Sequence, residues 1–291
     1  MHDAAGRRLP DFLLLGAQKA GSSWLGSRLG QHPDLWVHPD ELHFFDKEDR
    51  YARGLDWYAQ QFDAAPPDAL VGEKTPDYLL ADWHGGAEGH APDVHRHLHD
   101  ALPDAKLIVV LRDPVKRAVS AAKHLAKSGR VSPRIKLDDL LAGRRLELAE
   151  RHAVVTGGEY ARFLAPYIDL YGKDRILVLL FEEDVVADPA AGLARCCRHL
   201  GVDETFAFEG LHERGHANQR SLPRLYLDRW VPRLRRSGIS RRLDTLFPPH
   251  KDAPSPETLE ALRAHYAEPD AQLAALLRRD LPWAAKPQRK R

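Results

Sequence analysis

The 291-residue sequence lacks most features of a secreted or membrane-spanning protein. Its two cysteines, Cys196 and Cys197, are adjacent, so they cannot build the disulfide framework that small secreted domains use. Its apolar runs are shorter than the roughly 20 residues that a membrane span needs, and residues 1–10 lack the apolar centre of a signal peptide. These absences predict a cytoplasmic protein without a transmembrane segment.

An excess of charge of either sign is also absent. The chain has 43 basic and 42 acidic residues, for a formal net charge of +1. Nucleic-acid-binding proteins usually carry a marked basic excess, so we expect no nucleic-acid partner. The length and the 43% of hydrophobic residues suit a single globular domain over residues 1–291, with about 1–10 and 285–291 disordered. The sequence does not indicate whether the protein is a monomer or an oligomer.

Short apolar runs alternate with helical segments along the chain. The runs at 11–16, 106–111 and 175–181 lack alternating polar residues, which is typical of strands covered on both faces. Helical patterns follow at 22–29, from Pro114 onward, and precede the last run at 159–170. This order predicts an α/β fold: a P-loop-like three-layer domain with a central, mainly parallel sheet flanked by helices.

The middle of the chain contains a histidine-rich stretch. Its histidines are His84, His90, His95, His97 and His99. Their spacing matches no compact zinc pattern, and cysteine ligands are missing, so we expect no metal there. A solvated loop followed by a short helix is the preferred interpretation.

The C-terminal third contains an arginine-rich segment at residues 224–242. It holds seven arginines interleaved with Leu225, Trp230 and Leu234. Two interpretations stay open: a surface helix with a solvated basic face, or a contact with an acidic substrate or a membrane surface. Residues 256–278 have the pattern of one or two closing helices.

The first chemical signal is the loop that begins at Gly16. A strand that runs through a glycine-containing loop into a helix presents free backbone N–H groups, and the helix dipole favours an anion there. Gly16 and Gly21 have the spacing of a nucleoside-triphosphate P-loop, but Ser22 stands where that motif has lysine. Lys19 lies three positions earlier, which favours a 5′-phosphate over a Mg²⁺-bound triphosphate. An ordinary turn with a surface lysine is the alternative.

A second anion signal follows the run at 106–111. Arg112 would project from the carboxyl end of that strand, where open α/β sheets bind ligands. Ser120 lies eight residues further on, about two helical turns, and could face the same pocket. An arginine and a hydroxyl suit a phosphate dianion because arginine donates bidentately. Lys116 and Arg117 fit a surface charge cluster.

Together these segments resemble the sulfotransferases that use 3′-phosphoadenosine 5′-phosphosulfate (PAPS). Residues 19–23 resemble the family's 5′-phosphosulfate loop, and residues 112–120 resemble its 3′-phosphate motif. Residues 41–46 (ELHFFD) and 72–78 (GEKTPDY) resemble the branch that contains heparan sulfate and other glycan sulfotransferases with bacterial members. The four segments occur in the family's order, between about residues 11 and 200.

The resemblance implies which residues bind the PAPS donor. They are Lys19, Ala20, Gly21, Ser22, Ser23, Trp24, Arg112 and Ser120. No metal is expected in this scheme.

The resemblance also implies the catalytic residues. Glu41 is the expected base, and His43 would orient the acceptor or Glu41. Lys19 would stabilise charge on the leaving phosphate, Lys74 would reach the sulfuryl group or the acceptor, and Asp46 would contact the acceptor. The phenylalanines at 44 and 45 are expected to shield the Glu41 carboxylate from water.

The chain departs from the family at two places. Leu42 stands where the family usually has proline, between the glutamate and the histidine. The disulfide-bounded C-terminal loop of the human glycan-modifying members is missing; Arg214 and Asn218, with their neighbours, are expected to replace its contacts with the ligands.

These features predict a sulfotransferase that acts on a hydroxyl or amine of a small-molecule, lipid or glycan acceptor. The alternatives are a P-loop kinase-like nucleoside-phosphate transferase and a binding protein that has kept the fold without the chemistry. The first would place lysine after Gly21, where Ser22 stands.

Overall fold

The computed structural model describes residues 1, 6–80, 91, 93–213, 220–231, 233, 237–247 and 252–284. The chain divides into two compact units. The first comprises Met1–Asp113, Glu159–Arg214 and Ala267–Arg291, and the second comprises Pro114–Gly158 and Gly215–Tyr266. A single domain over 1–291 therefore stays a prediction.

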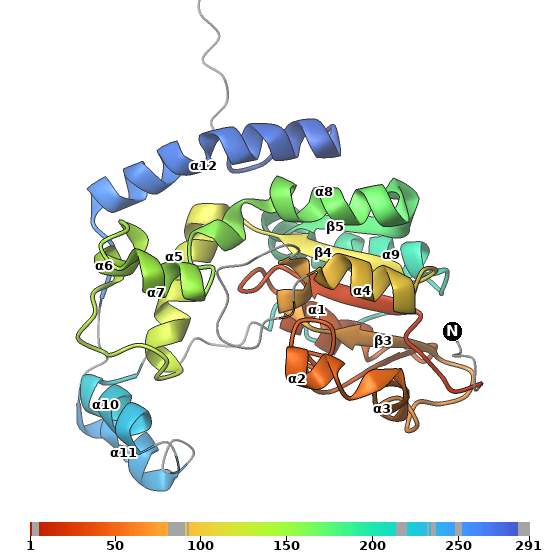
Figure 1. Ribbon diagram of the computed structural model, residues 1–291, viewed down its shortest axis with the longest axis horizontal. Coiled ribbons are helices and arrows are strands. Elements are labelled where there is room, and N and C mark those ends of the chain that lie inside the picture. Colours follow the sequence, from red (N-terminus) through yellow and green to blue (C-terminus); the bar gives the residue numbers. More distant parts are fainter. Residues whose placement is uncertain are drawn as a thin grey trace, which may run out of the picture. The chain divides into compact units, whose positions relative to one another are not determined.

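The first unit is built on a five-stranded sheet (Figure 1). Its strands are β1 (Phe12–Gly16), β2 (Leu35–Val37), β3 (Leu70–Lys74), β4 (Lys106–Leu111) and β5 (Ile176–Leu180). They lie in the order β2-β3-β1-β4-β5, and all four neighbouring pairs are parallel. Every residue of β1 is buried, as expected of a central parallel strand covered on both faces. The predicted fold class is confirmed.

The helices of the first unit flank this sheet. They are α1 (Ser22–Leu29), α2 (Glu48–Tyr51), α3 (Gly54–Gln60), α4 (Val94–Ala101), α8 (Tyr160–Tyr171) and α9 (Pro189–Leu200). Three shorter helical segments are η1 (Pro76–Leu79), η3 (Lys173–Arg175) and the π-helical η4 (Phe181–Ala187). α1 packs with α9, and α4 packs with α8. No helix in the described part of the chain combines the length and apolarity needed to cross a membrane.

The second unit is helical. It contains α5 (Pro114–Lys127), α6 (Leu137–Leu141), α7 (Leu146–Arg151), η2 (Thr156–Gly158), α10 (Leu222–Trp230) and α11 (Gly238–Leu246). The long helix α12 (Pro256–Leu277) begins in this unit and ends in the first.

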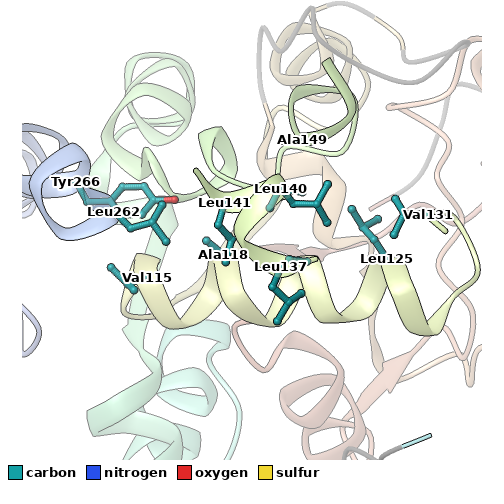
Figure 2. Packing of buried hydrophobic residues seen from close by; sticks show 12 residues of the cluster. Val115, Ala118, Leu125, Val131, Leu137, Leu140, Leu141, Ala149, Leu262 and Tyr266 are labelled. Carbon is teal, nitrogen blue, oxygen red and sulfur yellow. The ribbon is translucent and has the colours of Figure 1, made fainter. Parts of the chain in front are cut away.

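The core of the second unit follows from the spacing of apolar residues on α5 (Figure 2). Val115, Ala118, Ala122 and Leu125 recur every three or four residues, so they share one helical face. That face packs against side chains of α6 and the start of α12, among them Leu137, Leu140, Leu141, Leu262 and Tyr266.

Arg117 on α5 differs from its prediction as a surface charge. Its side chain is 2% exposed, and Nη2 donates to the carbonyl of Ala153 at 3.1 Å and to that of Val154. A buried guanidinium needs such acceptors. The arginine therefore fixes the turn after α7 instead of facing solvent, whereas Lys116 is exposed as predicted.

Most predicted elements in the first unit are confirmed, because their sequences are strongly apolar. β4 and α1 have the predicted bounds, and β1 and β5 are slightly shorter than the runs at 11–16 and 175–181. The sequence missed β2 and β3. β2 has only three residues, and β3 ends in glycine, glutamate and lysine, which give no strand signal.

The predicted disorder of residues 1–10 is wrong for the described residues 6–10. Leu9 is 2% exposed, and Arg8 donates to the carbonyls of Pro66 and Pro67 at 2.6 and 2.9 Å. A buried leucine and a multiply bonded arginine hold this segment against the first unit. Residues 285–291 lie outside the described part.

The adjacent cysteines and the histidines of α4 pack against other side chains of the first unit. Cys196 and Cys197 are buried free thiols on α9, and burial raises the pKa of Cys197 to about 11, so they behave as small apolar residues. His97 stacks on Tyr51 with ring centroids 4.2 Å apart. His95 is buried, and His99 packs edge-on against Tyr171. His84 and His90 lie outside the described residues.

Gly72 on β3 provides a test of the packing between strands. A Cβ atom there would lie 2.2 Å from Cζ of Phe12, whose ring is fully buried. We expect Gly72→Ala to lower the free energy of unfolding by about 1–3 kcal/mol, measured by urea denaturation. Gly238→Ala on α11 is the control, because no atom lies within 4 Å of its added Cβ. Equal stability of the two variants would contradict the packing of β3 on β1.

Candidate active site

The loop between β1 and α1 has the geometry of an anion site. The backbone passes through left-handed conformations at Lys19 (φ 69°) and Gly21 (φ 103°) before α1 begins at Ser22. A Cβ at position 21 would lie 2.9 Å from the ring of Phe181, so only glycine fits. The predicted sequence of strand, loop and helix N-terminus is present, and Ala20 and Ser22 are buried while Ser23 is exposed.

Arg112 lies beside this loop, because β4 is the neighbour of β1. Its Nη1 donates to the carbonyl of Lys19 at 3.1 Å, and its guanidinium carbon lies 4.8 Å from the ring centroid of Phe181. The two predicted anion signals therefore meet at adjacent strand ends. Ser120 belongs to α5 in the second unit, so its part in this site stays a prediction.

Two side chains at the loop carry buried hydrogen-bond donors that no described residue satisfies. They are Nε1 of Trp24 and Nε of Arg112. Buried donors in folded proteins are nearly always paired. These two, beside a glycine-containing loop, fit a ligand rich in acceptor oxygens and nitrogens, as a nucleotide phosphosulfate is.

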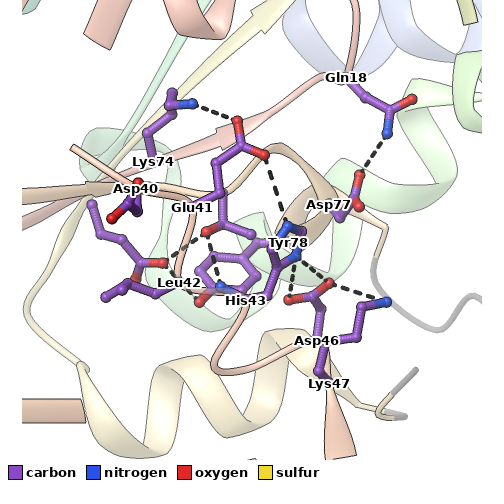
Figure 3. Close-up of polar contacts among 12 residues, drawn as sticks. Gln18, Asp40, Glu41, Leu42, His43, Asp46, Lys47, Lys74, Asp77 and Tyr78 are labelled. Atoms are coloured by element: carbon purple, nitrogen blue, oxygen red, sulfur yellow. Dashed lines mark hydrogen bonds and ion pairs between the residues drawn. The ribbon is translucent and has the colours of Figure 1, made fainter. Parts of the chain in front are cut away.

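Glu41, His43 and Lys74 are brought together from two segments (Figure 3). The ammonium of Lys74 forms an ion pair with Oε1 of Glu41, and Nε2 of His43 lies 3.8 Å from Oε2 of the same carboxylate. The Glu41 side chain is 37% exposed, and that of Lys74 is 12% exposed. The carboxylate therefore lies between two nitrogen groups and remains open to a ligand.

His43 is oriented by Asp46. Its Nδ1 lies 2.9 Å from Oδ2 of Asp46, and its backbone has a left-handed φ of 52°, which costs energy in a non-glycine residue. Burial of the ring opposes protonation, but the hydrogen bond and charge of Asp46 outweigh it and raise the pKa of His43. Asp46 itself is fully buried and orients His43, and its contact with the acceptor stays a prediction.

Lys74 lies beside the strand that leads into the loop of residues 17–21, called the anion loop below. It ends β3 and lies in register with Leu14 of β1. A Cβ at Gly26 of α1 would lie 3.3 Å from Cδ of Lys74, so the lysine stem passes close to α1. A further link joins the two segments: Nε2 of Gln18 donates to Oδ1 of Asp77 at 3.1 Å.

The phenylalanines next to Glu41 do not cover its carboxylate, in contrast to the expectation from the sequence. Phe44 stacks on Tyr58 with ring centroids 4.4 Å apart, and Phe44 and Phe45 are both buried. They pack into an aromatic cluster and leave the Glu41 carboxylate exposed, so the expected shielding is absent. Arg50 donates to the carbonyl of Leu42 at 2.9 Å, which fixes the position where the family usually has proline.

A buried hydrogen-bond network around Glu73 supports the segment around Glu41. The sequence did not predict this network. Glu73 accepts hydrogen bonds from Thr75 at 2.7 Å, Tyr78 at 2.9 Å, and Tyr58. The Tyr78 hydroxyl in turn accepts from the backbone N–H of Phe44 at 2.8 Å. The network thus ties β3 to the segment that carries Glu41 and His43. Three of its members stand in or next to the quoted motifs, but Tyr58 on α3 had no sequence signal.

The Glu73 network predicts a pH-dependent stability. Burial raises the pKa of Glu73, although the three hydroxyl donors lower it in part. Because the folded pKa exceeds the unfolded one, ionisation costs folding free energy, and that cost appears as the pH rises through the two pKa values. We expect the stability of Glu73→Gln relative to wild type to improve as the pH rises from about 4 to 7, measured by urea denaturation.

The control for this experiment is Glu48→Gln, which removes an exposed carboxylate on α2. If the free energies of unfolding of wild type and Glu73→Gln differed by a constant amount across this pH range, the raised pKa of Glu73 would be contradicted.

His43, Asp46 and Asp77 also approach one another closely. One ligand atom of each lies within 4.8 Å of the others, a separation at which they could hold a metal ion. All three groups already bond within the protein, since His43 pairs with Asp46 and Asp77 accepts from Gln18. That no metal takes part stays a prediction. Arg214 and Asn218, predicted to contact the substrate, lie outside the described residues.

Comparison with known proteins places these observations in a family. Residues 9–219 match the family model of the sulfotransferase domain. Human heparan sulfate glucosamine 3-O-sulfotransferase 6 is 33% identical over 199 residues, which is 67% of this chain and 53% of that protein. The membrane-associated sulfotransferase kil1 of Dictyostelium discoideum is 34% identical over 116 residues, 38% of this chain and 22% of that protein.

Among solved structures, a sulfotransferase from Alicyclobacillus acidocaldarius is similar, with a TM-score of 0.69 and 27% identity over 94% of this chain and 98% of that one. The chain spans about half the length of the heparan sulfate 3-O-sulfotransferase 6 proteins that it matches. Because the family model covers most of the sequence, including the anion loop, Glu41, Lys74 and Arg112, the chain belongs to the sulfotransferase domain family.

Proposed function

We propose that this protein transfers a sulfuryl group from PAPS to a hydroxyl or amine of a small-molecule, lipid or glycan acceptor. The observation that carries the proposal is the Glu41–Lys74 ion pair beside the anion loop. In this proposal Glu41 would act as the proton acceptor and Lys74 as a cation, next to the phosphate groups of the donor. Family membership favours this function over the kinase-like alternative.

On the donor side, the protein would bind two phosphate groups. Lys19 and the N-terminus of α1 suit the 5′-phosphate, and Arg112 suits the 3′-phosphate. A contact of Ser120 with the 3′-phosphate stays a prediction. The donor supplies an activated sulfuryl group whose bond to the 5′-phosphate oxygen breaks. Lys19 would stabilise the negative charge that the leaving phosphate gains.

On the acceptor side, Glu41 would take the proton of the attacking hydroxyl or amine as the new bond to sulfur forms. His43, held by Asp46, would keep the carboxylate in place. The ammonium of Lys74 would move from Glu41 toward the sulfuryl oxygens. The products are the sulfated acceptor, 3′-phosphoadenosine 5′-phosphate (PAP) and a proton.

Exposed carboxylates near Glu41 support a narrower acceptor class within this proposal. Asp40, Glu48 and Asp49 are exposed and close to it in sequence. Like charges disfavour a highly sulfated chain, so we favour an uncharged or amine-bearing acceptor. A cytoplasmic location is part of the proposal, supported by the two free thiols on α9.

Calorimetric titration without Mg²⁺ tests the donor site. We expect PAP to bind more tightly than ADP or ATP, and Arg112→Ala to weaken PAP binding about 10- to 100-fold through loss of a charged hydrogen bond. Arg96→Ala, an exposed arginine on α4, is the control. Equal binding of ADP, or binding of Mg²⁺-ATP alone, would overturn the proposal.

A further inference from the structure

Charge and exposed apolar surface coincide in one part of the second unit. Residues 220–247, called the α10–α11 hairpin below, contain eight arginines and two aspartates, whereas the whole chain has a formal net charge of +1. The remainder of the chain is therefore acidic. This concentration of charge has no part in the proposed chemistry.

The two aspartates of the hairpin form ion pairs with arginines of the same hairpin. Arg220 pairs with Asp228 at 2.7 Å, and Arg224 pairs with Asp244. Asp244 also accepts from the backbone N–H of Ser221 at 2.8 Å, so α10 and α11 lie side by side (Figure 1). Among the other arginines whose side chains are described, Arg229 donates to the carbonyl of Gly129 at 2.7 Å. Arg233 and Arg242 are exposed.

The same hairpin exposes large apolar side chains. The described residues contain eight large hydrophobic side chains that are exposed, and five of them belong to this segment: Leu222, Trp230, Val231, Leu246 and Phe247. Trp230 is 75% exposed and Leu246 is 73% exposed. On α10 the buried positions are Leu225 and Asp228, so Trp230 projects from a different side. So many exposed large apolar side chains in one segment favour an interaction site over ordinary surface.

We propose that the α10–α11 hairpin binds the surface of an anionic lipid bilayer. Arginines attract acidic headgroups, while tryptophan, leucine and phenylalanine enter the boundary between headgroups and acyl chains. A soluble polyanion would use the arginines and leave the apolar side chains in water. A bilayer uses both. This inference is independent of the reaction proposed above.

Vesicle sedimentation with the full chain tests the proposal. We expect binding to vesicles of phosphatidylcholine with phosphatidylserine, and at least about tenfold weaker binding to phosphatidylcholine alone. Added salt should weaken binding. A blue shift of tryptophan fluorescence should accompany binding and disappear in Trp230→Phe.

Two pairs of variants separate the apolar and charged contributions. The double variant Trp230→Ser with Leu246→Ser should lose most vesicle binding, and Leu146→Ser, at 60% exposure in the same unit, should not. Arg233→Glu with Arg242→Glu should weaken binding at least about tenfold, whereas Arg151→Glu, on α7, should not. Circular dichroism confirms folding, and exposed positions tolerate these changes.

Three results would overturn the inference. The first is no binding to phosphatidylserine vesicles. The second is equal loss of binding in the control variants. The third is self-association of the wild-type chain in gel filtration that the Trp230 and Leu246 substitutions abolish, which would assign this surface to a second copy. PAP titration is unaffected by any of them, so failure here is distinguishable from failure of the proposed function.

Discussion

Replacement of Glu41 by glutamine is expected to lower kcat by about 100- to 10,000-fold, because the amide cannot accept the acceptor's proton. PAP binding should hardly change, since Glu41 contacts Lys74 and His43 rather than the anion loop. The rate is measured as PAP released from PAPS, with the most active acceptor from a panel of hydroxyl and amine compounds.

Glu48→Gln is the matched control for Glu41→Gln, because it removes an exposed carboxylate seven residues away. A protein that binds nucleotide without chemistry would show no turnover in wild type and no effect of Glu41→Gln on binding. Near wild-type kcat in Glu41→Gln would show that another group accepts the proton, with His43 the nearest described alternative.

Replacement of Lys19 by alanine is expected to lower kcat by about 100- to 1,000-fold, comparable to removing one stabilising donor from an oxyanion site. Lys19 lies in the loop that Arg112 holds through the Lys19 carbonyl, and this backbone contact survives the substitution. The loop should therefore keep its shape while the charge is lost. The rate is measured as for Glu41→Gln.

Lys123→Ala, which removes an exposed lysine of α5, controls for a general loss of positive charge. The distinguishing feature is the division between kcat and KM. A lysine that acts on the leaving phosphate should change kcat more than the KM for PAPS. A rise in KM at constant kcat would assign Lys19 to donor binding alone.

The sequence predicted the parts of the fold that depend on continuous burial. β4 and α1 have the predicted bounds because every inward position is apolar or small. β3 was not predicted because its last three residues are not typical of a strand. Gly72 packs against Phe12, Glu73 belongs to the buried network, and Lys74 belongs to the candidate site. Local pattern cannot reveal a strand whose residues are chosen by their neighbours in space.

The sequence predicted which residues belong to the candidate site, but not how they contact one another. Four motif segments identified Lys19, Glu41, His43, Lys74 and Arg112, but not that Asp46 would be buried or that Tyr58 would bond to Glu73. These contacts join residues that are far apart in the chain or hidden by folding. One of the two interpretations of the arginine-rich segment was a single surface helix, whereas the structure has two helices there, α10 and α11.

The ion pair between Lys74 and Glu41 also bears on when the carboxylate can accept a proton. While the ammonium of Lys74 covers one carboxylate oxygen, that oxygen cannot remove a proton from water or from an acceptor. Arrival of the donor's negative charge beside β1 and β3 would draw the ammonium away and release the base. The base would then become available only when the donor is in place, so deprotonation of the acceptor would be coupled to the presence of PAPS.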